Sequence, residues 1–302
     1  MRPNFIVPCL WFDDQAEDAA RFYLGVFPDG QLKAVSRYPT DSDNPGGRPR
    51  GSVLTVEFEV AGQGFTALNG GPVFSINPSI SFFVHVDTVA EAERCFGQLA
   101  EGGEALMPFG AWPWSEGYGW VKDRFGVTWQ VIAGWRQEGG AVIVPCLMFS
   151  GPQAGRAEEA LTTWAELFPG GEVVRLERYG AGEGVEGTIK HGRARVGGQE
   201  LIAMDSHAPH AFNFNEGVSL QVGCQDQELL DRYWTSLSEG GAPGQCGWLK
   251  DRFGVSWQVV PSAIADWIAC EDPVARDRAF EAMLEMEKLD IAGLKGALDG
   301  PA

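Results

Sequence analysis

A fourteen-residue motif occurs twice in this chain, and this repeat limits the folds that the chain can adopt. The segment Gly119–Ile132 reads GWVKDRFGVTWQVI, and the segment Gly247–Val260 reads GWLKDRFGVSWQVV, so 11 of the 14 positions are identical. Chance does not preserve two tryptophans, a Lys-Asp-Arg run and a Phe-Gly turn in one order. The chain is therefore an internal duplication, and one structural module must occur twice.

Other landmarks repeat in the same order, which fixes the extent of the two copies. The matched pairs are Ile6–Phe12 with Ile143–Phe149, Val26–Gly30 with Leu167–Gly171, and Phe74–Asn77 with Phe212–Asn215. The second copy lacks about ten residues just before its closing motif, where the first copy carries the aromatic segment Met107–Tyr118. We expect a first domain over residues 1–136, a second over 141–262, and a C-terminal helical tail over 270–302.

Hydrophobic periodicity predicts the same order of elements in each half. In the first half we expect strands at 4–12, 31–38, 53–60 and 65–69 with a helix ending at Phe27, then a strand at 79–86, a helix at 88–101, and strands through the aromatic segment, 118–123 and 127–133. In the second half we expect helices at 153–167 and 226–238, with strands at 172–179, 185–196, 199–205, 217–223 and 247–260. The predicted fold is therefore α+β, with four βαβββ units. The tail, with apolar residues from Phe280 to Leu289, predicts an amphipathic helix against the domains or a partner subunit.

Composition excludes several classes of partner. The net charge of −18 and the pI near 4.6 argue against nucleic acid, whose phosphates select basic stripes, and against anionic membrane surfaces. The sequence has no run of 18 apolar residues and no N-terminal signal pattern, so we expect a cytoplasmic protein. The six cysteines include no Cys-x-x-Cys pair, and we interpret Cys9 and Cys146 as small core residues of equivalent strands.

The order of units and the closing Asp-x-Phe-Gly-x-x-Trp motifs resemble the vicinal oxygen chelate superfamily of glyoxalases, bleomycin-resistance proteins and extradiol dioxygenases. Within it, the chain looks like the PhnB-like branch, often labelled 3-demethylubiquinone-9 3-methyltransferase-like. The residues that carry this resemblance are Pro8–Phe12, Ala19 with Phe22-Tyr23, Phe27-Pro28, Phe74 with Asn77, Lys122–Gln130, and Met283–Ile291 in the tail. The resemblance implies that paired units curl into a half-open barrel, or cup, that holds a small ligand. We expect each half to form one such cup.

The resemblance also allows a test for a metal. Metal-dependent members of the superfamily place His or Glu on the first, fifth and closing strands. Here the first strands offer Ile6 to Cys9 and Val144 to Cys146, the fifth strands offer Ser79 to Phe83 and Gly217 to Gln221, and the closing strands carry Gln130 and Gln258. A neutral amide is a poor ligand for a divalent ion. We therefore expect no metal and no cofactor, and Gln130 and Gln258 become either structural hydrogen-bonding residues or ligand-reading groups.

The aromatic segment is the strongest candidate for a ligand-binding wall, because rigid aromatic faces suit planar or apolar ligands. It could instead cover a subunit interface. The predicted ligand-binding residues are Trp11, Phe83, Phe109, Trp112, Trp114, Tyr118, Trp129, Gln130, Trp257 and Gln258. Lys122-Asp123-Arg124 and its repeat at 250–252 predict tight turns. His85 is interpreted as a packed strand residue.

We conclude from the sequence that the chain is a metal-independent protein that binds a small organic molecule in its first cup. The alternatives are a metal-dependent enzyme of the glyoxalase or dioxygenase type, and a structural or assembly role that includes a homodimer. No catalytic residue can be named. Methyl transfer is not supported, because no Gly-x-Gly loop joins a strand to a helix, and Gly62-Gln63-Gly64 lies in a turn between strands.

Overall fold

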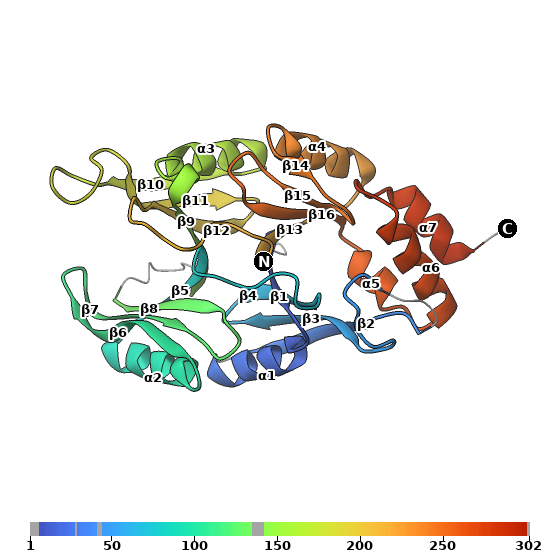
Figure 1. Ribbon diagram of the computed structural model, residues 1–302, viewed down its shortest axis with the longest axis horizontal. Coiled ribbons are helices and arrows are strands. Elements are labelled where there is room, and N and C mark those ends of the chain that lie inside the picture. The colour runs from blue at the N-terminus through green and yellow to red at the C-terminus, as the bar shows by residue number, and fades with distance from the viewer. Residues whose placement is uncertain (1–5, 28, 41–43, 135–141, 301–302) are drawn as a thin grey trace.

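The computed structural model describes residues 6–27, 29–40, 44–134 and 142–300, and it contains the four expected βαβββ units (Figure 1). The elements of the first half are β1 (Ile6–Phe12), α1 (Ala16–Val26), β2 (Gln31–Arg37), β3 (Val53–Val60), β4 (Gln63–Asn69), β5 (Ile80–Val86), α2 (Val89–Ala100), β6 (Glu104–Trp112), β7 (Ser115–Lys122) and β8 (Thr128–Ala133). Gly62 lies in the β3–β4 turn, as the sequence predicts.

The second half repeats this order with shorter strands at its end. Its elements are β9 (Ile143–Phe149), a 3₁₀ turn at Gly151–Gln153, α3 (Ala157–Leu167), β10 (Glu172–Arg178), β11 (Ile189–Val196), β12 (Gln199–Asp205), β13 (Val218–Cys224), α4 (Gln227–Ser238), β14 (Ala242–Pro243), β15 (Trp248–Lys250) and β16 (Ser256–Pro261). The aromatic segment explains the difference in length. It extends β6 and β7 into a long hairpin, whereas β14 and β15 have only 2 and 3 residues.

The sixteen strands form two curled sheets of eight strands, and each sheet combines strands of both halves. One sheet has the order β14-β15-β16-β13-β1-β4-β3-β2, and we call its concave side cup A. The other has the order β10-β11-β12-β9-β5-β8-β7-β6, and we call its concave side cup B. Neither sheet closes into a barrel, so both cups are half-open.

The expectation that each half forms its own cup is therefore wrong, because each cup is built from strands of both halves. The halves join through two antiparallel contacts, β1 with β13 and β5 with β9, each over five register pairs. Since β9 repeats β1 and β13 repeats β5, the same edges could have paired within one half. The edges themselves carry no signal that distinguishes the two arrangements.

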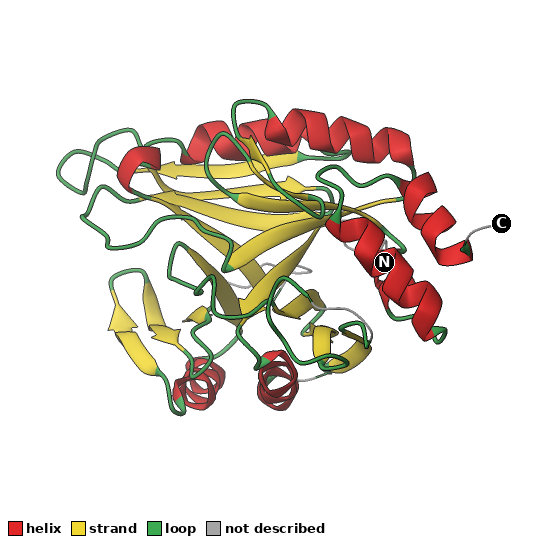
Figure 2. Ribbon diagram, turned by 45° about the vertical axis from the view of Figure 1, so that its right-hand side comes forward, coloured by secondary structure: helices red, strands yellow, loops and turns green. Residues whose placement is uncertain are grey.

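The main hydrophobic core lies on the convex sides of the sheets, under the four long helices. Helices α1 and α2 cover the lower layer and α3 and α4 cover the upper layer, with the strands between them (Figures 1 and 2). The largest fully buried side chains of this core include Trp129, Trp164, Trp257, Tyr23 and Tyr233. Burying aromatic residues of this size accounts for a large part of the apolar area that each unit removes from water.

The tail forms two helices instead of one, a short helix precedes it, and all three lie at the side of cup A. These helices are α5 (Ile264–Ile268), α6 (Pro273–Leu284) and α7 (Ile291–Asp299), at the right of Figure 1. The ring of Phe280 packs edge-on against Tyr38, with centroids 6.0 Å apart. Between α6 and α7, the Met286 carbonyl accepts the amide of Cys246 at 2.7 Å. The tail thus packs against the domains, beside the short β14–β15 hairpin.

Candidate functional site

The repeated Lys-Asp-Arg motif is structural, because its aspartate anchors a turn from inside the core. Asp123 accepts hydrogen bonds from the amides of Phe125 and Val127 at 2.8 and 3.0 Å, from Trp129 Nε1 at 2.8 Å and from the Tyr23 hydroxyl at 2.8 Å. Gly126 supplies the left-handed conformation that the turn needs, with φ of +89°. The predicted turn is confirmed.

Asp251 repeats this arrangement in the second half, with Trp164 in the place of Tyr23. Burial raises the pKa of Asp251 to about 6, and four N–H donors oppose that shift by stabilising the carboxylate. One of these donors is Trp257 Nε1, at 2.9 Å. Trp129 and Trp257 are therefore core residues under the helices, which removes them from the predicted ligand-binding set. Adjacent residues of a strand point to opposite faces, so the neighbouring glutamines face the cups.

The floor of each cup contains a glutamine hydrogen-bonded to a serine of the same half, with a cysteine of the other half beside them. In cup B, Gln130 Nε2 donates to Ser81 Oγ at 2.8 Å, and the Tyr118 hydroxyl donates to Gln130 Oε1 at 2.6 Å. Cys146, opposite Ser81 in the register, completes this floor from the second half.

Cup A has the equivalent floor with the contributions of the halves exchanged. Gln258 Nε2 donates to Ser219 Oγ at 2.9 Å, and Cys9 of the first half lies opposite Ser219. Both glutamines thus have protein partners and hold the floor together. These floors occupy the strand positions at which metal-dependent relatives are expected to hold their ligands.

The donor set of neither floor suits a divalent cation. Burial raises the pKa of Cys9 to about 11 and that of Cys146 to about 12, so both remain neutral thiols, and the other donors are a neutral amide and a hydroxyl. Divalent ions require thiolate, imidazole or carboxylate ligands. In the part of the chain that the structure describes, no group of three His, Cys, Asp or Glu side chains is placed to bind a metal.

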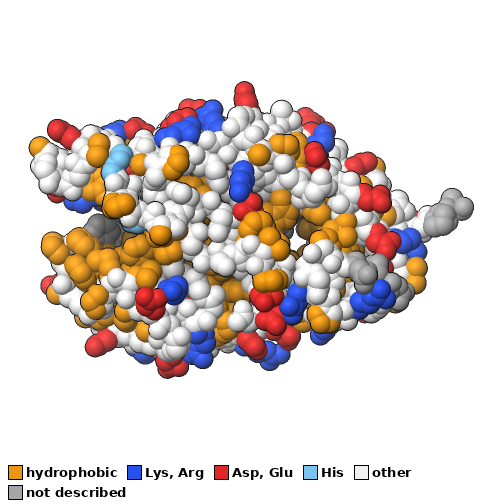
Figure 3. Space-filling view, viewed as in Figure 1, with side chains coloured by type: hydrophobic (Ala, Val, Ile, Leu, Met, Phe, Trp, Pro, Cys, Tyr) orange, Lys and Arg blue, Asp and Glu red, His pale blue; other side chains and the backbone are white. Residues whose placement is uncertain are grey.

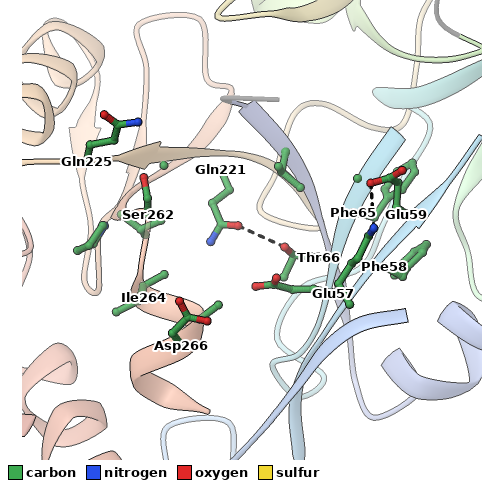
Figure 4. Close-up of a pocket in the computed structure, with 17 residues that line it drawn as sticks. Glu57, Phe58, Glu59, Phe65, Thr66, Gln221, Gln225, Ser262, Ile264 and Asp266 are labelled. Atoms are coloured by element: carbon green, nitrogen blue, oxygen red, sulfur yellow. Dashed lines mark hydrogen bonds and ion pairs between the residues drawn. The ribbon is translucent and has the colours of Figure 1, made fainter. Parts of the chain in front are cut away.

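Cup A contains a groove of about 480 Å³ between β3 and β4 on one side and β13, β16 and α5 on the other (Figure 4). Glu57 and Asp266 face it from opposite walls, and the Thr66 hydroxyl donates to Gln221 Oε1 at 3.2 Å across it. Burial, and secondarily the charge of Asp266, raises the pKa of Glu57. Among the residues described, Glu57 has no ion-pair partner, whereas Glu59 two residues on pairs with Lys33 at 3.4 Å.

A second pocket of about 100 Å³ lies in cup A, and the tail forms part of its wall. Cys9, Gln258 and Trp248 line it from the sheet, and Phe280 and Met283 line it from α6. Trp11 lies at the rim of cup A. Its ring packs edge-on against Trp248 and Phe74, with centroids 5.8 and 5.0 Å apart. Its Nε1 donates to the Gly71 carbonyl at 2.8 Å.

Cup B carries the aromatic hairpin. Trp112 stacks on Trp114 with centroids 5.4 Å apart, and Tyr118 meets Trp114 edge-on at 5.6 Å. Hydrophobic side chains gather over this region, beside a hollow between the two layers at the left of Figure 3. Phe83 faces the same cup in a separate apolar cluster with Tyr118. Phe109 does not, because it packs on Phe96 of α2 at 5.6 Å on the convex side.

The two cups carry opposite charges at equivalent positions, a feature that sequence analysis missed. Strands β3 and β11 are both eight residues long and pair in the same register with β4 and β12. Glu57 and Glu59 of β3 therefore correspond to Arg193 and Arg195 of β11. Aligning the two halves at this strand would have exposed the reversal. The two copies have thus diverged inside their cups while keeping the same floors.

Comparisons with known proteins identify the family of both halves. A family model described as 3-demethylubiquinone-9 3-methyltransferase matches residues 4–132 and again residues 141–260. A PhnB protein from Bacillus cereus is 33% identical over 42% of this chain and 97% of its own, with a TM-score of 0.38. A protein from Pseudomonas aeruginosa is 31% identical over 41% of this chain and 93% of its own, with a TM-score of 0.36.

More distant solved structures share the fold over most of the chain. Glyoxalase I from Zea mays is 12% identical over 83% of this chain and 89% of its own, with a TM-score of 0.54. No curated protein matches the chain. No described helix is both long and apolar enough to cross a membrane. Since the family model matches both halves, the chain belongs to the 3-demethylubiquinone-9 3-methyltransferase (PhnB-like) family, as a tandem duplication.

Proposed function

We propose that this protein binds a small organic molecule without a metal, in the groove of cup A, and that the ligand carries a positively charged amine. The observation that carries the proposal is the unpaired Glu57 facing a groove of about 480 Å³. Ligand pockets of proteins commonly have volumes of about 300–1,000 Å³ and place a few polar groups in a largely apolar lining. The groove lies within that range of volumes.

The acidic side chains on the walls of the groove favour a ligand with a positive charge. A partly buried carboxylate without a cation is costly, and an ammonium group placed between Glu57 and Asp266 would relieve that cost. The amide of Gln221 and the hydroxyl of Thr66 would then orient the polar part of the ligand, while Val7, Val260 and Ile264 supply apolar lining. We use 2-naphthylmethylamine as a probe because it combines an ammonium group with a planar apolar body.

Glu57→Gln is expected to weaken binding of 2-naphthylmethylamine about 10-fold to 100-fold. The change keeps the shape of the side chain and removes a charge-assisted hydrogen bond of about 1.5–3 kcal/mol. Calorimetric titration of the chelator-treated protein measures the effect. Glu59→Gln is the matched control, because it removes the same charge from a side chain that already pairs with Lys33. Equal losses in the two variants would contradict a specific role of Glu57.

The same interaction predicts a pH dependence. Because burial raises the pKa of Glu57, its carboxylate takes up a proton at a higher pH than an exposed glutamate does. Affinity for the amine should therefore fall as the pH is lowered through that raised pKa, while the amine stays charged. Titrations from about pH 8 to pH 4 test this. The Glu57→Gln protein should lose this pH dependence, and an unchanged profile in that variant would assign the titration to another group.

A further inference from the structure

Cup B contains buried polar groups that have no partner in the described residues. His85 on β5 is only 2% exposed, and neither of its ring nitrogens makes a hydrogen bond. Arg193 on β11 is 5% exposed; its guanidinium pairs with Glu200 through Nη2, and its Nε–H has no acceptor. The indole Nε1–H of Trp120 is likewise buried and unpaired. Buried polar groups are nearly always satisfied, so a cluster of exceptions needs an explanation.

These groups face one interior. His85 and Phe83 lie on the same side of β5, with their rings stacked and centroids 5.6 Å apart. From the opposite arm of the curled sheet, His191 meets Phe83 edge-on at 6.1 Å, two residues before Arg193 on the same face of β11. Trp120 is opposite Gln130 in the register, and Gln130 is opposite Phe83. The unpaired donors therefore surround the apolar cluster of cup B.

The surroundings of the donors determine which ligand they suit. The cluster is built from flat or apolar side chains, namely Phe83, Tyr118, Ile132, Val144, Cys146 and Ile202, with Met107, Trp112, Trp120 and Met204 against it. Such surfaces pack favourably against a planar aromatic ring. Trp120 Nε1 and Arg193 Nε can only donate, so the polar part of the ligand must accept hydrogen bonds.

The field in cup B favours an acceptor with negative charge. Burial, and after it the charge of Arg193, lowers the pKa of both His85 and His191 to about 4, so both imidazoles are neutral at pH 7. Arg193 brings a positive charge into cup B, where Glu200 pairs with it. In cup A the equivalent residue of Arg193 is Glu57, which reverses this field.

We propose that cup B is a second ligand site, which binds a planar aromatic anion. The ring would lie among Phe83, Tyr118 and Trp112, and a carboxylate or similar oxygen group would accept hydrogen bonds from Trp120 Nε1 and Arg193 Nε. One nitrogen of neutral His85 donates to the same group. This site is independent of the amine site of cup A, and each site can fail without the other.

The test is calorimetric titration of the full-length protein with 2-naphthoate, the anionic counterpart of the amine probe. Trp120→Phe keeps an aromatic side chain but removes the N–H donor together with the five-membered ring of the indole, and we expect about a tenfold loss of naphthoate affinity. Trp248→Phe is the matched control, because Trp248 is the repeat of Trp120 in cup A. It should leave naphthoate binding unchanged, as should Glu57→Gln.

Further variants keep the test decisive if one of them is unstable. Arg193→Lys retains the charge and loses the Nε donor, and Trp112→Ala removes part of the wall; both should weaken naphthoate binding and leave the amine affinity of cup A unchanged. Equal naphthoate losses in Trp120→Phe and Trp248→Phe, or no saturable binding by the wild type, would overturn the proposal. A change of oligomeric state in Trp112→Ala with unchanged naphthoate affinity would assign the hairpin to a subunit interface.

Discussion

Asp251→Ala is expected to lower the free energy of unfolding by several kcal/mol, because each buried donor left without an acceptor costs about 1–3 kcal/mol. The carboxylate accepts four hydrogen bonds, from the amides of Phe253 and Val255 and from the indoles of Trp164 and Trp257. Its loss leaves four buried donors unsatisfied in the core of the second half. Urea unfolding followed by far-UV circular dichroism measures the change.

The matched variants locate the cause of this loss. Asp123→Ala should be equally destabilising, because Asp123 accepts the same number of hydrogen bonds in the first half. Lys250→Ala, at the neighbouring position of the motif, removes only a half-exposed ion pair with Glu216 and should cost about 1 kcal/mol or less. If Lys250→Ala lowered the free energy of unfolding as much as Asp251→Ala, the hydrogen bonds of the aspartate would not explain why the motif is repeated.

Residues 1–136 expressed alone are expected to form a homodimer. In the full chain β1 pairs with β13 and β5 pairs with β9. In the isolated first half, β1 and β5 each lose an antiparallel contact of five register pairs. Unpaired apolar edges are templates for association with another chain. A second copy offers the right partners, since β5 repeats β13 and β1 repeats β9. Light scattering coupled to size-exclusion chromatography should give twice the mass of the fragment.

Producing the two halves together gives a second prediction about their pairing. When residues 1–136 and 141–302 are produced together, they should associate in preference to self-pairing, because the floors of the cups then regain their native Cys9 and Cys146 partners. A fragment 1–136 that remains monomeric and unfolds cooperatively would mean that one half can complete a cup by itself, against the sheet order described above.

The sequence predicted the units well and their assembly poorly, for identifiable reasons. Repetition and strand periodicity located the four units, and the family resemblance led to Gln130 and Gln258 on the cup floors. The pairing of the halves could not be predicted, since equivalent strands compete for the same edges. Trp129 was misplaced although a signal was available, because it precedes cup-facing Gln130 and adjacent strand residues face opposite sides.

The opposite charges of the two cups could also have been predicted from the sequence, but they were missed. Glu57 and Arg193 occupy the same position of repeated strands and carry opposite charges. This difference bears on ligand binding only because both side chains face the interior of a cup. His85 shares the face of Phe83 by the same alternation. Its lack of a partner within the described chain depends on tertiary packing, which periodicity does not report.

The account depends most directly on metal-free binding in cup A. The deciding measurement is calorimetric titration of 2-naphthylmethylamine into the full-length protein before and after exhaustive treatment with a chelator. We predict saturable binding of one amine per chain with the same affinity in both samples. Binding that disappears after chelation and returns when a divalent metal is added would contradict the account and make the protein a candidate metalloenzyme.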